Sequence, residues 1–319
     1  CSAPPKGYLM LRRSVACLLS VFFAMSTAGC KRAPEVEIDH NLSIGSTHDL
    51  NIARDVAYAP GPRRSLDVYA PKAGDGAAPV IVYIYGGAWA SGSKEESAWI
   101  GASLARRGFV AVIPDYRIYP EGLWPLFLQD NAAAVAWTRR TIAHYGGDPN
   151  QIVLVGHSSG AFNVFSLAVD RRWLEAEGLD PKNDVRAVIG LSGPYSMLPL
   201  DGRREHAIFG KGRNYTEPYA HIDGRSPPLL LLVGAEDGAA GPWNSPEAAE
   251  NVRKKGGEAE AILYPSVSHA DTRDAFGGLP LGSNAPILKD ISAFLARHGV
   301  SPRAQAQAGA ASTLEQGRP

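Results

Sequence analysis

Short runs of consecutive apolar residues recur along the chain, and segments with helical spacing of apolar positions lie between them. The clearest runs are 79–85, 109–113, 152–155, 185–191 and 228–234. Runs that are short and apolar throughout are typical of parallel strands covered on both faces. The candidate helices lie at 95–107, 124–145, 161–168, 245–255 and 287–298. This alternation predicts an α/β fold with a mostly parallel central sheet and helices on both of its faces.

The region before the first buried run has a different pattern. Apolar and polar residues alternate at 55–58 and again at 65–69, and a Pro/Gly turn at 60–62 separates the two stretches. This pattern predicts a hairpin of early strands. A further strand is expected at 260–264, close to the end of the domain.

The chain from 51 to 300 reads as one domain, because no internal repeat or convincing boundary divides it. Residues 192–227 show little periodicity and are rich in Gly, Pro, Arg and Tyr. An irregular stretch of this length predicts a lid or a binding loop. The Ala/Gln/Gly-rich segment 301–319 is expected to be a disordered tail.

Residues 1–30 read as an N-terminal extension followed by a signal peptide. Two arginines at 12 and 13 precede a short apolar stretch at 15–25, and small residues then lead to Cys30. The ending resembles a bacterial lipobox, although Thr27 stands where a branched aliphatic residue is usual. We expect export, with Cys30 lipidated in the periplasm or cell envelope and 31–50 as a tether. Ordinary cleavage after Ala28, which would give a secreted protein, and a retained anchor are the alternatives.

Composition narrows the classes of partner. Lys plus Arg equals Asp plus Glu at 32 each, so no nucleic-acid partner is expected. All three cysteines lie within the first 30 residues, which leaves the domain without a disulfide framework. Zinc-type Cys/His spacings are also missing from the sequence. We predict no metal and no cofactor, and contact with a membrane only through a lipid at Cys30.

The best candidate for chemistry is the stretch Gly156-His157-Ser158-Ser159-Gly160. It follows a buried strand and precedes a helical pattern, and this context turns a Gly-x-Ser-x-Gly match into a nucleophile hypothesis. The two glycines allow the strand and the helix to approach closely around Ser158. The sequence therefore predicts Ser158 as an exposed nucleophile at a helix N-terminus.

A serine hydroxyl needs a base and an orienting acid, which in this order of elements follow it in the chain. His269 lies in the loop between the last strand and the final helix, and Asp237 lies three residues past the strand that ends at Gly234. Glu236 is the nearest rival to Asp237, whereas Asp271 and Asp274 would need another chain order. Four other histidines are placed less favourably, before the acid, beside the serine or at the end of the last helix: His206, His221, His157 and His298.

Backbone amides must stabilise the oxyanion of the intermediate. Ser159 supplies one, and the glycine-rich turn after strand 79–85 supplies the others, at Gly87 and Ala88. Aromatic side chains are candidates for the substrate cleft, although core packing explains them equally well. They are Trp89, Tyr119, Trp124 and Trp243.

Four ordered motifs resemble those of α/β-hydrolase esterases of the hormone-sensitive-lipase-like and bacterial carboxylesterase group, with BD-FAE-like and kynurenine-formamidase-like members. They are 83–89 for the oxyanion segment, 114–121 for an Asp-Tyr-Arg…Pro-Glu stretch, 146–149, and the elbow at 156–160. The resemblance covers about residues 50–300 and implies the α/β-hydrolase fold. Tyr85 stands where the family has a histidine. We therefore expect the oxyanion loop to be held differently from the loop in the family.

The residues and the resemblance together predict a serine hydrolase that cleaves small or aromatic carboxylic esters through an acyl-enzyme. In this scheme His269 takes the proton of Ser158, and Asp237 orients the imidazole. An amidase or formamidase, and a sugar-acetyl or feruloyl esterase, are alternatives on the same fold. A non-catalytic surface binding protein is a third. The oligomeric state is not predicted.

Overall fold

The computed structural model describes residues 47–72, 76–196, 200, 202–210, 216–277 and 286–303. Contacts divide the chain into units 1–37 and 38–319, and every described residue belongs to the second unit. The predicted signal peptide with Cys30 and nearly all of the predicted tether and tail lie outside the described residues. None of the described helices is long and apolar enough to cross a lipid bilayer.

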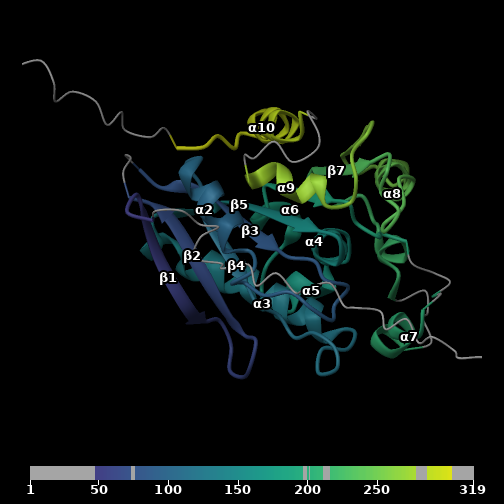
Figure 1. The fold of residues 1–319 in the computed structure, drawn as a ribbon, viewed down its shortest axis with the longest axis horizontal. Coiled ribbons are helices and arrows are strands. Elements are labelled where there is room, and N and C mark those ends of the chain that lie inside the picture. Colours follow the sequence, from purple (N-terminus) through teal and green to yellow (C-terminus); the bar gives the residue numbers. More distant parts are fainter. Residues whose placement is uncertain are drawn as a thin grey trace, which may run out of the picture. The chain divides into compact units, whose positions relative to one another are not determined.

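An eight-stranded sheet runs through the domain in the order β1-β2-β4-β3-β5-β6-β7-β8 (Figure 1). β2 pairs antiparallel with both of its neighbours, and the remaining pairs are parallel. The predicted α/β class and the N-terminal hairpin are thus confirmed. The strands are β1 (Leu50–Ala57), β2 (Ser65–Pro71), β3 (Ala78–Ile84), β4 (Val110–Pro114), β5 (Gly147–His157), β6 (Ala187–Leu191), β7 (Leu229–Gly234) and β8 (Ala259–Tyr264).

The helices follow the strands along the chain and pack on the sheet. Figure 1 shows α10 above the central strands β3 and β5, and α3 on the opposite side of them. The helices are α2 (Ala98–Arg106), α3 (Leu126–Thr141), α4 (Ser159–Val169), α5 (Arg172–Glu175), α6 (Pro181–Asp184), α7 (Arg203–Phe209), α8 (Asn244–Lys254), α9 (Asp271–Asp274) and α10 (Ile287–Arg297). Three short 3-10 helices complete the set: η1 (Ile142–Tyr145), η3 (Pro218–His221) and η4 (Ala275–Gly277).

The core lies where the central strands meet these helices. Every residue of β3, β4, β6 and β7 is buried, as expected for parallel strands with both faces covered. The four leucines of β7 are each 0% exposed, and burying one leucine side chain contributes about 1.5–3 kcal/mol. This rigid sheet fixes the positions of the loops at its carboxyl edge, where ligands bind in open α/β sheets.

The structure differs from the prediction at several element ends. The helix expected at 124–145 is α3 followed by η1, and the helix expected from 95 begins at Ala98. β5 begins at Gly147, ahead of the apolar run at 152–155. The described part of 192–227 contains α7 and η3, although no helix was expected there. Elements of four to seven residues are too short to leave a clear apolar period, so the sequence does not reveal them.

Candidate active site

Ser158 occupies the sharp turn between β5 and α4. Its backbone has φ 56° and ψ −124°, a conformation that is uncommon for a residue with a side chain. The Ser158 amide donates a 2.9 Å hydrogen bond to the Leu191 carbonyl at the end of β6. Because that bond ties the turn to the neighbouring strand, Ser158 is held partly exposed at the N-terminus of an otherwise buried helix.

The two glycines of the motif allow the close approach that the turn requires. A Cβ on Gly156 would lie 2.2 Å from the Gly160 carbonyl oxygen, and a Cβ on Gly160 would lie 2.1 Å from the Ile84 oxygen. Real Cβ atoms do not approach oxygen so closely, so strand and helix can take this geometry only with glycine at both positions. The predicted strand–elbow–helix arrangement is therefore present.

The structure brings the predicted acid and base into contact. Asp237 follows β7 and is 1% exposed, and His269 follows β8. The Nδ1 atom of His269 lies 3.0 Å from each carboxylate oxygen of Asp237. The Oδ1 atom also accepts hydrogen bonds from the amides of Ala239 and Ala240, at 3.0 and 2.8 Å. The carboxylate is therefore fixed from two sides.

The pKa of Asp237 reflects these contacts. Burial by itself would raise it, but the hydrogen bonds from His269 and from the Ala240 amide outweigh burial and lower the pKa to about 2. Asp237 is consequently ionised at neutral pH and faces the imidazole as a carboxylate.

The residues that were alternatives to Asp237 and His269 in the sequence lie away from this pair. Glu236 is exposed, and Asp271 accepts hydrogen bonds from the amide and hydroxyl of Ser268. Among the other histidines, His298 lies 3.5 Å from Glu258, and His221 contacts Arg172. None of these groups approaches the imidazole of His269 among the contacts of the described residues.

His157, beside the candidate nucleophile, links the elbow to the base. Its Nε2 atom lies 2.9 Å from the His269 carbonyl oxygen, and the two imidazole rings are 4.8 Å apart. The Thr272 hydroxyl donates to the same carbonyl at 3.1 Å. Burial lowers the pKa of His157 to about 3, so the ring is neutral and its Nε2–H is the donor. The sequence indicated only that His157 shapes the elbow, and it gave no signal for Thr272.

The predicted oxyanion loop lies against the nucleophile. A Cβ on Gly86 would be 2.8 Å from the Ser158 Cβ and 2.9 Å from the His157 oxygen. Gly87 and Ala88 follow in left-handed conformations, with φ 117° and 51°. Within the described residues their amides donate no hydrogen bond, and the amide of Ser159 has no acceptor within its own helix. Three N–H groups are thus available beside Ser158.

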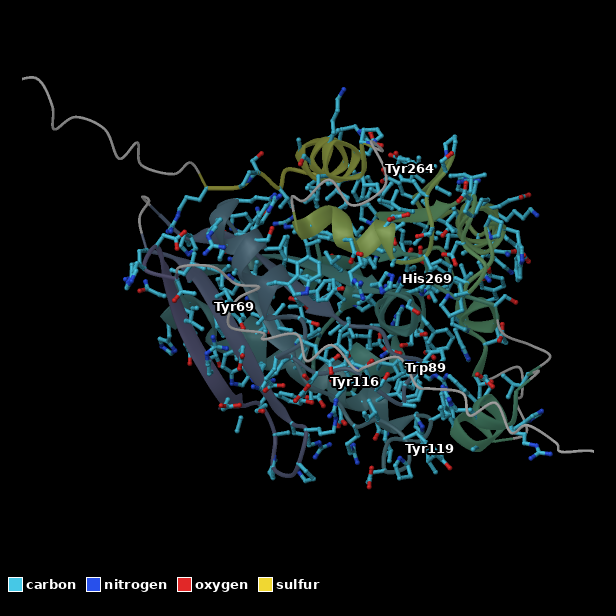
Figure 2. The ribbon with its side chains drawn as sticks, viewed as in Figure 1. Tyr69, Trp89, Tyr116, Tyr119, Tyr264 and His269 are labelled. Carbon is cyan, nitrogen blue, oxygen red and sulfur yellow. The ribbon has the colours of Figure 1, made fainter. Side chains whose placement is uncertain are left out.

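The aromatic candidates divide into buried and exposed rings. Trp89 is 4% exposed, packs against Phe127, Phe162 and Phe209, and donates its indole N–H to Asn163 at 2.9 Å. Its side chain is therefore part of the core, and the packing alternative describes it. Tyr119 and Trp243 are 41% and 54% exposed. Figure 2 shows Trp89 inside the outline of the fold and Tyr119 at its edge.

In the part of the chain that the structure describes, no three His, Cys, Asp or Glu side chains are grouped so that they could hold a metal ion. The chemistry that the arrangement can support is proton transfer from a serine to an imidazole oriented by a carboxylate, with amides nearby for a developing negative charge.

Comparison with known proteins gives a consistent result. A model of the BD-FAE family matches residues 66–251, more than half of the chain. A probable isoprenylcysteine alpha-carbonyl methylesterase ICMEL1 of Arabidopsis thaliana is 30% identical over 243 residues, covering 69% of this chain and 51% of that protein. Esterase LipC of Mycobacterium tuberculosis is 35% identical over 210 residues, covering 58% and 51%. The chain spans about half the length of these curated relatives.

Solved structures agree on the fold. A truncated carbohydrate esterase from gut microbiota has a TM-score of 0.68 and 24% identity, and the similarity covers 78% of this chain and 96% of that chain. The predicted α/β-hydrolase fold and the resemblance drawn from the four motifs are confirmed. The chain belongs to the BD-FAE family.

Proposed function

We propose that this protein is a serine ester hydrolase that uses Ser158, His269 and Asp237. The observation that carries the proposal is the contact of His269 Nδ1 with both oxygens of the buried Asp237, at the sheet edge where the Ser158 elbow ends β5. Relatives named esterase and methylesterase support it. Because the chain spans about half their length, the reaction is inferred for this chain from its own residues.

In the acylation step, the Nε2 atom of His269 accepts the proton of the Ser158 hydroxyl while the Oγ atom attacks the ester carbonyl carbon. The resulting oxyanion accepts hydrogen bonds from the amides of Gly87, Ala88 and Ser159. When the C–O bond to the alcohol breaks, His269 returns its proton to the leaving alkoxide. Asp237 stabilises the imidazolium that forms between these two transfers.

Deacylation repeats the sequence with water as the nucleophile. His269 accepts a proton from water while the water oxygen attacks the acyl carbon. The proton then passes to the Oγ atom of Ser158 as the acid leaves.

We propose small or aromatic esters as substrates. The exposed rings of Tyr119 and Trp243 support an aromatic contribution, since each offers a flat apolar surface to solvent. In the described parts of 192–227, Phe209 packs against Trp89, the residue that follows Ala88 of the proposed oxyanion loop. This contact supports the proposal that 192–227 covers the site as a lid.

We also propose that the protein is exported and lipid-modified at Cys30, as the signal-like pattern of residues 10–30 indicates. Mass spectrometry of the N-terminal peptide from the producing cell tests this directly. A diacylglycerol-modified Cys30 supports the proposal, whereas an unmodified N-terminus after Ala28 indicates plain secretion.

The central experiment compares the native protein with Ser158→Ala. The native protein should hydrolyse p-nitrophenyl acetate and be labelled by a fluorophosphonate at Ser158, and the variant should show neither property. Ser159→Ala is the matched control, because it removes a neighbouring hydroxyl but leaves the backbone amide in place. A panel of acyl esters, formyl-kynurenine and acetylated or feruloylated xylan then separates an esterase from a formamidase or sugar esterase. Full activity in Ser158→Ala would overturn the proposal.

A further inference from the structure

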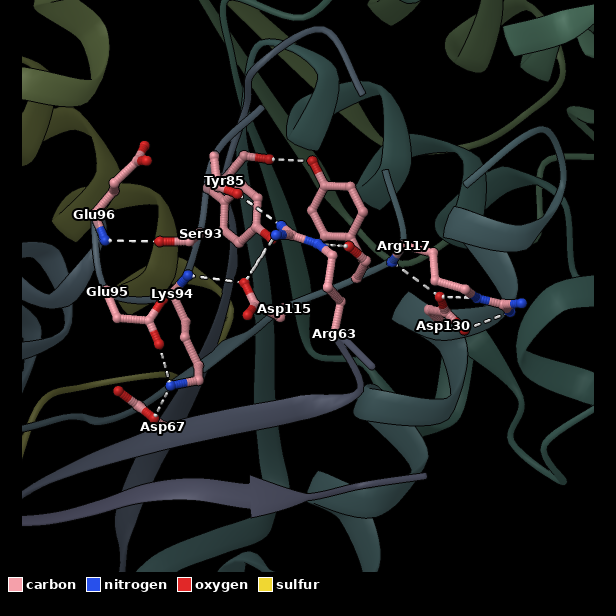
Figure 3. Close-up of polar contacts among 12 residues, drawn as sticks. Arg63, Asp67, Tyr85, Ser93, Lys94, Glu95, Glu96, Asp115, Arg117 and Asp130 are labelled. Atoms are coloured by element: carbon pink, nitrogen blue, oxygen red, sulfur yellow. Dashed lines mark hydrogen bonds and ion pairs between the residues drawn. The ribbon is translucent and has the colours of Figure 1, made fainter. Parts of the chain in front are cut away.

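Tyr85 forms the first residue of the oxyanion loop and makes an unusual set of contacts beneath it. Tyr85 is 4% exposed, and its hydroxyl donates a 2.7 Å hydrogen bond to Oδ1 of Asp115. The phenol oxygen of Tyr85 in turn accepts a 2.8 Å hydrogen bond from Nη2 of Arg63. A single phenol oxygen therefore connects a cation with a carboxylate, since a hydroxyl can donate and accept at once (Figure 3).

Arg63 contacts both ends of the loop. The nitrogen Nη2 that bonds Tyr85 also donates to the Gly92 carbonyl at 2.7 Å. The Nε atom donates to the Tyr116 carbonyl at 2.9 Å. Because Tyr85 and Gly92 bracket the segment 86–91, one guanidinium spans that segment from beneath, and its rigid geometry fixes the distance between the two ends.

Asp115 and Tyr116, which directly follow β4, hold the same segment from the neighbouring strand end. Oδ1 of Asp115 accepts the amide of Lys94 at 2.9 Å, just beyond the loop. The Tyr116 hydroxyl donates to the Tyr85 carbonyl at 2.9 Å, and the two rings are stacked with centroids 4.7 Å apart. The loop is thus anchored before, beneath and after the amides of Gly87 and Ala88.

Arg63 comes from a distant part of the chain. It lies in the turn of the β1–β2 hairpin with φ 55°, and its side chain is 31% exposed. It also lies 3.6 Å from Asp115 as an ion pair. The hydrogen bonds of the Arg63 guanidinium are directed, so its contribution is best measured by what they hold in place.

We propose that Arg63, Tyr85 and Asp115 are positioning residues that fix the oxyanion loop through the phenol of Tyr85, so that the Gly87 and Ala88 amides keep the geometry that the reaction needs. This inference rests on the proposed serine-esterase function for its kinetic consequence. A misplacement of about 1 Å near a reacting centre can cost about 100-fold in rate. Loss of these bonds therefore changes kcat, whereas substrate contacts made elsewhere are retained.

The test uses two conservative variants of the full chain, Tyr85→Phe and Arg63→Gln. Tyr85→Phe keeps the stacked ring and removes only the hydroxyl. Each variant should lower kcat on p-nitrophenyl acetate by about 10- to 100-fold, with KM changed less than about threefold. The double variant should lose no more than about twice the larger single loss, because both changes break the same connection.

A second trio on the same hairpin provides matched controls. Arg54 donates to the Tyr69 hydroxyl at 3.4 Å, and that hydroxyl donates to Asp67 at 3.2 Å, which repeats the chemistry without contacting residues 85–92. Asp67 pairs instead with the Lys94 ammonium, beyond the loop, at 2.9 Å. Tyr69→Phe and Arg54→Gln should leave kcat within about twofold. Unchanged kcat in Tyr85→Phe and Arg63→Gln, equal losses in the controls, or fully multiplicative losses in the double variant overturn the inference.

Hydrogen–deuterium exchange separates this inference from the proposed function. Peptides covering 85–94 should exchange faster in Tyr85→Phe and Arg63→Gln than in the native protein, with other peptides unchanged. If the native protein is inactive but the exchange of 85–94 still responds to these variants, the esterase proposal is overturned and the positioning of the loop is retained. An active native protein whose 85–94 exchange does not respond overturns the positioning alone.

Discussion

His269 presents Nδ1 to both carboxylate oxygens of Asp237 at the same distance, 3.0 Å. One of these oxygens is already bound by the amides of Ala239 and Ala240. The carboxylate therefore cannot turn away from the imidazole without losing backbone hydrogen bonds. This relationship makes the side chain of Asp237 a sensitive place to test the proposed reaction.

Asp237→Asn should lower kcat by about 10³- to 10⁴-fold with little change in KM. The backbone amides will keep the asparagine oxygen, so the side-chain NH2 takes the other position, within reach of Nδ1. That donor favours the imidazole tautomer with a proton on Nε2, which cannot accept the serine proton. Steady-state kinetics measures the effect.

Glu236→Gln, at the exposed neighbouring position, serves as the control and should stay within about twofold of the native protein. An Asp237→Asn variant with a tenth of native activity would contradict the role of Asp237.

His157 should make the fold acid-sensitive. The unfolded chain binds a proton on this ring near pH 6.5, whereas in the folded protein its pKa is about 3. Between these values the unfolded state binds more protons, so stability is present above pH 6.5 and is lost as the pH falls towards 3. From pH 7 to pH 4 this group alone should remove about 3 kcal/mol of the free energy of unfolding.

His157→Gln tests this prediction, because glutamine places an amide N–H near the position of Nε2 but does not titrate. Urea denaturation at pH 7 and pH 4 should show a loss in the variant that is smaller by about 3 kcal/mol. Identical losses in both proteins would show that His157 does not titrate as its burial implies. His298→Gln is a control for removing a histidine from another part of the fold, where its Nε2 atom lies 3.5 Å from Glu258.

The two exposed rings should behave differently from the buried one. Trp243→Ala should raise KM for aromatic esters by about three- to tenfold, and more than for acetate, with a change in unfolding free energy below about 0.5 kcal/mol. Trp89→Ala should instead destabilise the fold by about 3–5 kcal/mol, because its ring fills a buried cluster. Kinetics with p-nitrophenyl acetate and phenylacetate esters, together with thermal unfolding, separates these effects. Equal KM changes for both substrates would remove Trp243 from the proposed substrate site.

The buried parts of the fold were predictable from the sequence because their cause is local. Continuous apolar runs and glycine pairs leave a direct signal, and for that reason β3, β7 and the elbow around Ser158 were expected where the structure has them. The proposed acid and base were also predictable, since Asp237 and His269 each follow a strand at the same sheet edge.

The supporting contacts were not predictable, because they join residues that are distant in the chain. Arg63 reads as one polar residue in a turn, and only the pairing of β2 with β4 brings its hairpin to Tyr85 and Asp115. Trp89 was ambiguous for a related reason. A tryptophan after a Gly-Gly pair has the same pattern whether its indole faces a cleft or, as here, Asn163 and three phenylalanines.

The elbow supplies a last test, in which two glycines of different kinds are compared. Gly160→Ala places a methyl group 2.1 Å from the carbonyl oxygen of Ile84, the last residue of β3, and 2.5 Å from the carbonyl oxygen of Tyr85, which follows it. Helix α4 must then move away from β3, which should cost about 3 kcal/mol or more and displace Ser158 from His269. Gly146→Ala meets no atom within 4 Å but has φ +81°, so it should cost only about 1 kcal/mol and leave kcat unchanged. Urea denaturation and p-nitrophenyl acetate kinetics measure both quantities. A Gly160→Ala protein as stable and active as Gly146→Ala would mean that the elbow tolerates a wider separation of strand and helix than this geometry allows.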